Sequence, residues 1–293
     1  MAVPVQVIRL GVIGVVIAGF ITFKYVAAGM VEDKIGGAMA KAGIPSESVS
    51  YDASVDIFGF NVHLEDVVID IPGKDKMKID EITINNFDSE HTIPEFINIE
   101  VEGIDGKILF ASSPLAKVSK NLFEEQDEVK LNFAVNYEFD ADDKTLNIKE
   151  VSQSIDNLGE VSFSTVLHNV NSIENFVQRM MMNPSSMEVG KSSLEYEDDS
   201  LVEKIIAFNA EKKGISADKY KEDMLAGLKK ELEQVNEKED SDLEQDLLAL
   251  VIDFVQSPDE LEISIDPKEP MSLREITRGN PSDTLKKLNL EIN

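Results

Sequence analysis

The most apolar segment of the chain is an uninterrupted run from Leu10 to Phe23, flanked by Arg9 and Lys24. This run is shorter than the roughly 20 residues of a full membrane span. The following "KYVAAG" resembles the end of a signal peptide, so cleavage is one interpretation. If the long side chains of Arg9 and Lys24 reach toward the two interfaces, apolar neighbours extend the span to Val3–Met30. We therefore expect a retained transmembrane anchor over residues 1–30, which includes Arg9, Leu10, Gly14, Ala18, Phe23 and Lys24.

The position of this segment also predicts an orientation. A short N-terminus stays in the cytoplasm, and the long domain after Met30 is then exported. We expect a single-pass protein of the bacterial inner membrane, anchored in the lipid bilayer by its N-terminal helix, with its C-terminal domain in the periplasm. Residues 31–47 are expected to form a membrane-proximal helix and linker.

Residues 48–170 show the period of two that is typical of half-buried strands. In "FNVHLEDVVIDIP" the apolar positions change step between Leu64 and Val67, which predicts a bulge or turn at Glu65 and Asp66. "VKLNFAVNYEF" places its apolar positions on one face, and "DADDK" is expected to form a hairpin loop. The two blocks of strands have a similar style, so an internal duplication is one interpretation. The pattern predicts an antiparallel β-rich region.

The apolar strand positions of this region raise the question of what covers them. Either the C-terminal helices cover the apolar sheet face, or part of it stays open as a binding surface for acyl chains. The positions that would form such a surface are Val67, Ile69, Ile82, Ile84, Val129, Leu131, Phe133 and Val135.

Residues 171–293 change to a helical period with closing strands. A stripe that begins at Tyr220 and ends at Val235 predicts a helix with one buried face. The helix Leu243–Val255 is apolar nearly all round from Leu247, so we expect it to be buried. The predicted fold class is therefore α+β: an N-terminal transmembrane helix, an antiparallel β-rich region and a mainly helical C-terminal region.

An apolar N-terminal helix, a short helix and then strands of the form "FNVHLEDVVIDIP", "KMKIDEITINNF" and "PEFINIEVEGIDG" resemble the start of AsmA-like envelope proteins of Gram-negative bacteria. The resemblance covers residues 5–110. It implies an inner-membrane protein with a periplasmic β-rich domain and a role in envelope assembly or lipid handling. The chain departs from the family's larger members, which have many more strands, because it turns helical after residue 170.

Charge and composition exclude several classes of function. The chain carries a net charge of −28 at pH 7, which repels nucleic acid and anionic headgroups. It contains no cysteine, which excludes disulfides and thiol chemistry. Both "NPS" sequences have proline in the middle position and are not glycosylation sites. These features favour an exported bacterial protein.

Motifs for catalysis are not found in the sequence. "VGKSS" lacks the first glycine of a phosphate-binding loop, and His63, His91 and His168 are too scattered to predict a metal site. Asp140 and its neighbours lack the glycine and distal glutamate of a calcium loop. We expect no enzyme activity, no cofactor and no metal.

Two functional classes remain. The first is a non-enzymatic, membrane-anchored envelope protein that binds lipid or assists envelope assembly. The second is an accessory subunit of a larger inner-membrane protein complex, which docks through its helix and the acidic run from Glu231 to Asp246.

Overall fold

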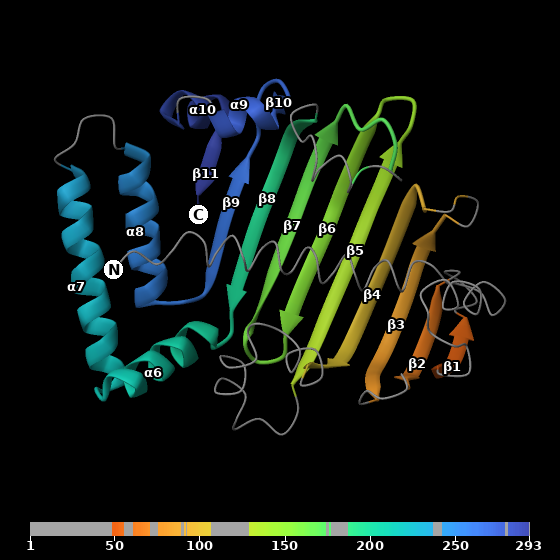
Figure 1. Cartoon of the computed structure of the whole chain (residues 1–293), viewed down its shortest axis with the longest axis horizontal. Coiled ribbons are helices and arrows are strands. Elements are labelled where there is room, and N and C mark those ends of the chain that lie inside the picture. The colour runs from red at the N-terminus through yellow and green to blue at the C-terminus, as the bar shows by residue number, and fades with distance from the viewer. Residues whose placement is uncertain are drawn as a thin grey trace.

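A computed structural model of the chain describes residues 49–55, 61–70, 76–88, 91, 93–106, 129–173, 176, 187–236, 242–278 and 281–292. Its dominant feature is one antiparallel sheet of 11 strands (Figure 1). The strands are β1 (Val49–Val55), β2 (Val62–Ile69), β3 (Met77–Phe87), β4 (Phe96–Asp105), β5 (Lys130–Asp140), β6 (Thr145–Ile155), β7 (Gly159–His168), β8 (Glu188–Asp198), β9 (Glu260–Ile265), β10 (Met271–Ser272) and β11 (Leu290–Ile292).

The strands follow one another across the sheet in chain order. The order is β1-β2-β3-β4-β5-β6-β7-β8-β9-β11, and the short β10 pairs with β8. The predicted α+β architecture, with a transmembrane helix, a β-rich region and a mainly helical C-terminal region, is therefore wrong. The C-terminal strands were expected as closing strands, but β8, β9 and β11 extend the same sheet. Sequence periodicity identifies a strand and says nothing about which strand it pairs with.

The change of step predicted in β2 is confirmed. Asp66 has φ 50°, and the pairing of β1 with β2 shifts register at this point, from Ser50↔Val68 to Asp52↔Glu65, so that β2 carries one extra residue. Aspartate tolerates this left-handed conformation better than most residues because its short polar side chain bonds locally. The irregular residue keeps both Leu64 and Val67 on the buried face, at 8% and 3% exposure.

One face of the sheet forms the hydrophobic core. Its most buried members are Ile97 and Ile104, each 1% exposed. Of the eight positions considered for an open apolar surface, Ile69 and Val135 are half-buried and six are buried core residues: Val67, Ile82, Ile84, Val129, Leu131 and Phe133. This burial leaves no basis for an acyl-chain groove at these positions, so we correct the prediction of lipid binding and do not carry it forward.

The described helices are α6 (Leu201–Lys213), α7 (Ala217–Asn236), α8 (Asp242–Gln256), α9 (Leu273–Arg278) and α10 (Pro281–Leu288). Figure 1 shows α7 and α8 side by side near the β9 and β11 end of the sheet. The rings of Tyr196 on β8 and Phe254 on α8 pack edge to face with centroids 5.8 Å apart. The prediction of a fully buried α8 is wrong, since Ile252 is buried while Val251 is 41% exposed.

The residues assigned to a membrane anchor, from Arg9 to Lys24, lie outside the described residues. Among the helices that the structure describes, none combines the length and apolar composition needed to cross a bilayer. The longest, α7, has 20 residues but is rich in lysine and glutamate. As a correction, the predicted inner-membrane location with a periplasmic domain has no support in the described residues. Neither it nor an envelope role is carried forward.

Candidate functional site

Rows of carboxylates lie on the sheet face opposite the core, across the later strands β7, β8 and β9. Successive residues of a strand point to opposite faces, so the apolar positions of β7 to β9 alternate with serine and glutamate. The register places Glu160 opposite Glu197 and Glu197 opposite Glu260. In the next row Glu195 lies opposite Glu262. We call Glu150, Glu160, Glu195, Glu197, Glu260 and Glu262 the acidic patch.

A shallow depression of about 330 Å³ lies over part of the acidic patch. Its lining residues are Lys149, Glu150, Glu160, Ser162, Phe163, Ser164, Ser193, Glu195 and Glu197. The one cation among them, Lys149, points its Nζ at Glu138 Oε2 at 3.0 Å, outside the patch. Small serine side chains between longer glutamates leave the hollow, which is open, polar and negative.

Four of the six glutamates of the acidic patch have no cationic partner within the described part of the chain. Glu160, Glu195, Glu197 and Glu260 form no ion pair among the described residues. Burial raises the pKa of the Glu160 carboxyl above its ordinary value of 4.5, a hydrogen bond from Ser152 lowers it in part, and Glu197 and Glu150 raise it further. Like charges directly opposite one another destabilise a sheet, so this face favours a positively charged ligand.

In a second carboxylate row, on β2 to β4 of the same sheet, the central glutamate has internal partners. Glu81 lies opposite both Glu65 and Glu102. Its Oε1 lies 2.7 Å from His63 Nδ1 and accepts a hydrogen bond of 2.9 Å from the Thr83 hydroxyl. The hydrogen bond with His63 is the main reason that the pKa of Glu81 is lowered. The central glutamate of this row therefore has a histidine and a hydroxyl as partners, whereas Glu160, Glu197 and Glu260 form no ion pair among the described residues.

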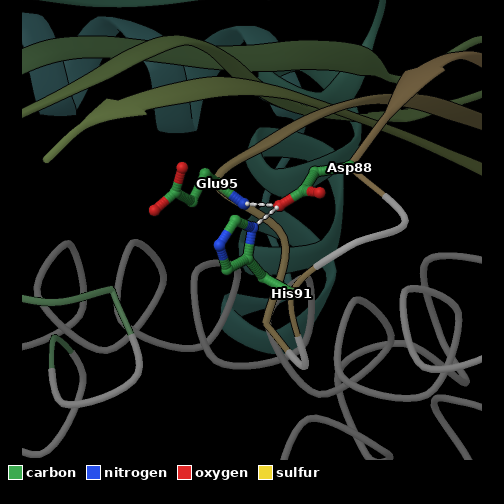
Figure 2. Close-up of side chains that lie close together, drawn as sticks. All are labelled: Asp88, His91 and Glu95. Carbon is green, nitrogen blue, oxygen red and sulfur yellow. Dashed lines mark hydrogen bonds and ion pairs between the residues drawn. The ribbon is translucent and has the colours of Figure 1, made fainter.

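A separate group of polar side chains lies in the loop between β3 and β4 (Figure 2). Oδ2 of Asp88, a residue that is 5% exposed, accepts a hydrogen bond of 2.9 Å from the backbone N–H of Glu95. Nδ1 of His91 lies 2.8 Å from the same oxygen. One potential ligand atom each from Asp88, His91 and Glu95 lies within 4.8 Å of the others.

Strand β5 holds this loop in place. The Tyr137 hydroxyl donates a hydrogen bond of 2.8 Å to the Pro94 carbonyl, and the Phe139 N–H donates one of 2.6 Å to the Glu95 carbonyl. Burial raises the pKa of the Tyr137 hydroxyl, and the charge of Asp88 adds to the rise. The backbone at Pro94 and Glu95 is therefore fixed by two hydrogen bonds from the neighbouring strand.

The structure separates the three histidines that the sequence analysis considered. His63 lies beside Glu81 on the polar face, His91 lies in the β3–β4 loop, and His168 Nδ1 lies 3.4 Å from the Thr145 hydroxyl. "VGKSS" lies within β8, so it forms no phosphate-binding loop.

Sequence reasoning missed the acidic patch. Glutamate at alternate positions of "GEVSF", "LEYED" and "ELEIS" was the available signal. The sequence does not show that these glutamates lie opposite one another, because that depends on the register of β7, β8 and β9.

Comparisons with known proteins place the acidic patch almost entirely in a matched region. A family model described as "Uncharacterized protein" matches residues 152–293. This range contains β7 to β11 and every member of the patch except Glu150. No curated protein matches the chain. The resemblance to AsmA-like proteins is not tested by these comparisons and stays a prediction.

Proposed function

We propose that this chain is a non-enzymatic binding protein that docks a lysine- or arginine-rich segment of a partner protein on the acidic patch. The observation that carries the proposal is the row Glu160–Glu197–Glu260, in which each carboxylate faces another across neighbouring strands. None of these three forms an ion pair among the described residues. A partner's cations would remove this repulsion on binding.

The spacing of strands in a sheet suits an extended basic segment. Neighbouring strands lie about 4.8 Å apart, so the carboxylates of one row form a line across β7, β8 and β9. Side chains on the same side of an extended peptide repeat every two residues, about 6.6–6.8 Å, and long lysine side chains can adjust to that line. Charge complementarity of this kind mainly supplies specificity and fast association.

The docking role expected from the sequence is retained, and its place changes. The sequence analysis put the docking surface on the acidic run from Glu231 to Asp246. The first residues of this run lie on α7, a helix whose lysines and glutamates are interspersed. Glu160, Glu195, Glu197 and Glu260 form no ion pair among the described residues, which is why we place the docking surface on the sheet.

The test is a titration of the full chain into a fluorescein-labelled peptide of alternating lysine and serine, followed by anisotropy at physiological ionic strength. The patch variant is the double substitution Glu160→Gln/Glu197→Gln. The matched control is Glu65→Gln/Glu102→Gln, which removes the same charge from the carboxylate row on β2 to β4. Because both variants change the net charge equally, nonspecific attraction falls equally in both.

We expect the patch variant to bind the peptide about tenfold more weakly, which corresponds to about 1.4 kcal/mol. The control should bind within about twofold of the wild type, or about 0.4 kcal/mol. Equal losses in the two variants, or no binding by the wild type, would overturn the proposal.

A further inference from the structure

We propose that Asp88, His91 and Glu95 form a binding site for a divalent transition-metal ion of the Zn²⁺ type, to which each residue supplies one ligand atom. This inference concerns the β3–β4 loop and does not depend on the docking function proposed for the acidic patch. Its basis is the mutual distance of the three ligand atoms, all within 4.8 Å (Figure 2).

The donor set matches the chemistry of such an ion. Zn²⁺ binds imidazole nitrogen at about 2.0–2.1 Å and carboxylate oxygen at about 2.0–2.2 Å, and sites with three protein ligands leave a position for water. One imidazole and two carboxylates are what this loop presents. Mg²⁺ and Ca²⁺ prefer oxygen ligands alone, so the histidine selects against them.

Binding requires a small opening of the His91–Asp88 pair and a rotation of the Glu95 side chain. Two ligands of a tetrahedral zinc shell lie roughly 3.3 Å apart, as bond lengths of about 2.0–2.1 Å dictate. His91 Nδ1 and Asp88 Oδ2 lie 2.8 Å apart, so the pair has to open by roughly half an ångström. In Figure 2 the Glu95 carboxylate lies on the side of the His91 ring and points away from Asp88. Rotation of this side chain would bring its oxygen to the third position.

The surroundings hold the Asp88 carboxylate and the backbone of Glu95 in place and leave the site open on the side of His91. Asp88 is buried and its Oδ2 accepts the Glu95 N–H, while a carboxylate oxygen has a further lone pair for an ion. Tyr137 and Phe139 fix the backbone of Pro94 and Glu95. The His91 side chain is 50% exposed, which gives an ion a path from solvent.

His63 supplies a matched control within the same sheet. Its Nδ1 lies 2.7 Å from Glu81 Oε1, so it forms a histidine–carboxylate pair of nearly the same length as His91 and Asp88. Within the described residues, only the loop group adds a second carboxylate at ligand distance. Comparison of the two histidines therefore separates a three-residue site from ordinary attraction of a cation by a histidine beside an acid.

The experiment is calorimetric titration of ZnCl₂ into the full chain after EDTA treatment and dialysis, with excess Mg²⁺ present to occupy exposed carboxylates. We expect one zinc ion per chain. His91→Ala and Glu95→Gln should each weaken binding at least about tenfold, and His63→Ala should leave it unchanged. Urea unfolding of the metal-free variants checks that each is folded, and the isosteric Glu95→Gln provides a second test should His91→Ala perturb the loop.

Three results would overturn the site. The first is absence of zinc binding by the wild type in the presence of Mg²⁺. The second is equal weakening by His63→Ala and His91→Ala. The third is unchanged binding in Glu95→Gln, which would reduce the group to a hydrogen-bonded loop. Peptide binding by the acidic patch is expected to be the same in all three variants, so the two proposals fail independently.

Discussion

Replacement of Glu160 by glutamine is expected to stabilise the folded protein at neutral pH. In the folded state this carboxylate lies opposite Glu197. Burial raises its pKa, and the negative charges of Glu197 and Glu150 raise it further. Glutamine has nearly the same size and keeps an oxygen that can accept a hydrogen bond. The substitution therefore removes two like-charge interactions and changes little in packing.

The size of the effect follows from the register. Cross-strand pairs are each worth about 0.2–1 kcal/mol, and like charges directly opposite are unfavourable. Removal of the interactions with Glu197 and Glu150 should raise the free energy of unfolding by roughly 0.4–2 kcal/mol on that scale. Salt screens charges near the surface, so the gain should shrink as ionic strength rises.

The pH dependence has a definite sign. The pKa of Glu160 is higher in the folded state than its ordinary 4.5, so protonation favours the folded protein. Its stabilising contribution is fully present below about pH 4.5 and is lost as the pH rises through the folded-state pKa. The advantage of Glu160→Gln should therefore appear above that pKa and vanish at acid pH. Urea unfolding at a series of pH values measures the difference directly.

Glu81→Gln is the control, with the opposite expectation. Hydrogen bonds from His63 and Thr83 lower the pKa of Glu81, so its charge stabilises the folded state above about pH 4.5, and this contribution is lost as the pH falls through the lowered pKa. Glu81→Gln should therefore lower stability at neutral pH. If both variants change stability in the same direction, or if the gain from Glu160→Gln persists at acid pH, the account of uncompensated charge is refuted.

Two further predictions test the sheet itself by urea unfolding. Gly159→Ala should lower the free energy of unfolding by about 1–3 kcal/mol, because φ is +146° and an added Cβ would lie 2.3 Å from the Glu197 carbonyl oxygen. In the control Gly227→Ala, in α7, the added Cβ meets nothing within 4 Å, so no loss of stability is expected. Equal effects of the two substitutions would contradict the pairing of β7 with β8. Ile97→Ala should lower the free energy of unfolding by about 2–5 kcal/mol, because Ile97 is 1% exposed. Val251, at 41% exposure, should lose under about 1 kcal/mol when replaced by alanine. A large loss of stability in Val251→Ala would mean that this side of α8 is buried.

Local patterns in the sequence predicted local structure where the chain alone determines it. The change of step at Glu65 and Asp66 was visible as a shift in apolar alternation, and Asp66 has the expected irregular backbone. The loop "DADDK" forms the turn between β5 and β6, where Asp140 Oδ1 accepts the N–H groups of Asp142 and Asp143. Both features depend on neighbouring residues only.

Features that depend on pairing between distant segments were not predictable. Glu160, Glu197 and Glu260 become one row only when β7, β8 and β9 pair in their observed register. The exposure of Val251 was hidden for a similar reason, since an apolar helix looks buried until its packing partners are known. Asp88, His91 and Glu95 are close in the sequence, but they lie in an irregular loop where no periodic pattern marks side chains that converge.

The most direct test of the docking proposal is to map where a bound lysine-rich peptide lies. A zero-length carbodiimide couples lysine amines to carboxylates in contact, and mass spectrometry then identifies each linked glutamate. Docking on the acidic patch predicts that crosslinks concentrate on Glu160, Glu195, Glu197 and Glu260. Crosslinks of equal yield on Glu65 and Glu102, or crosslinks mainly on α7, would contradict the proposal and assign the binding to the general negative charge of the chain.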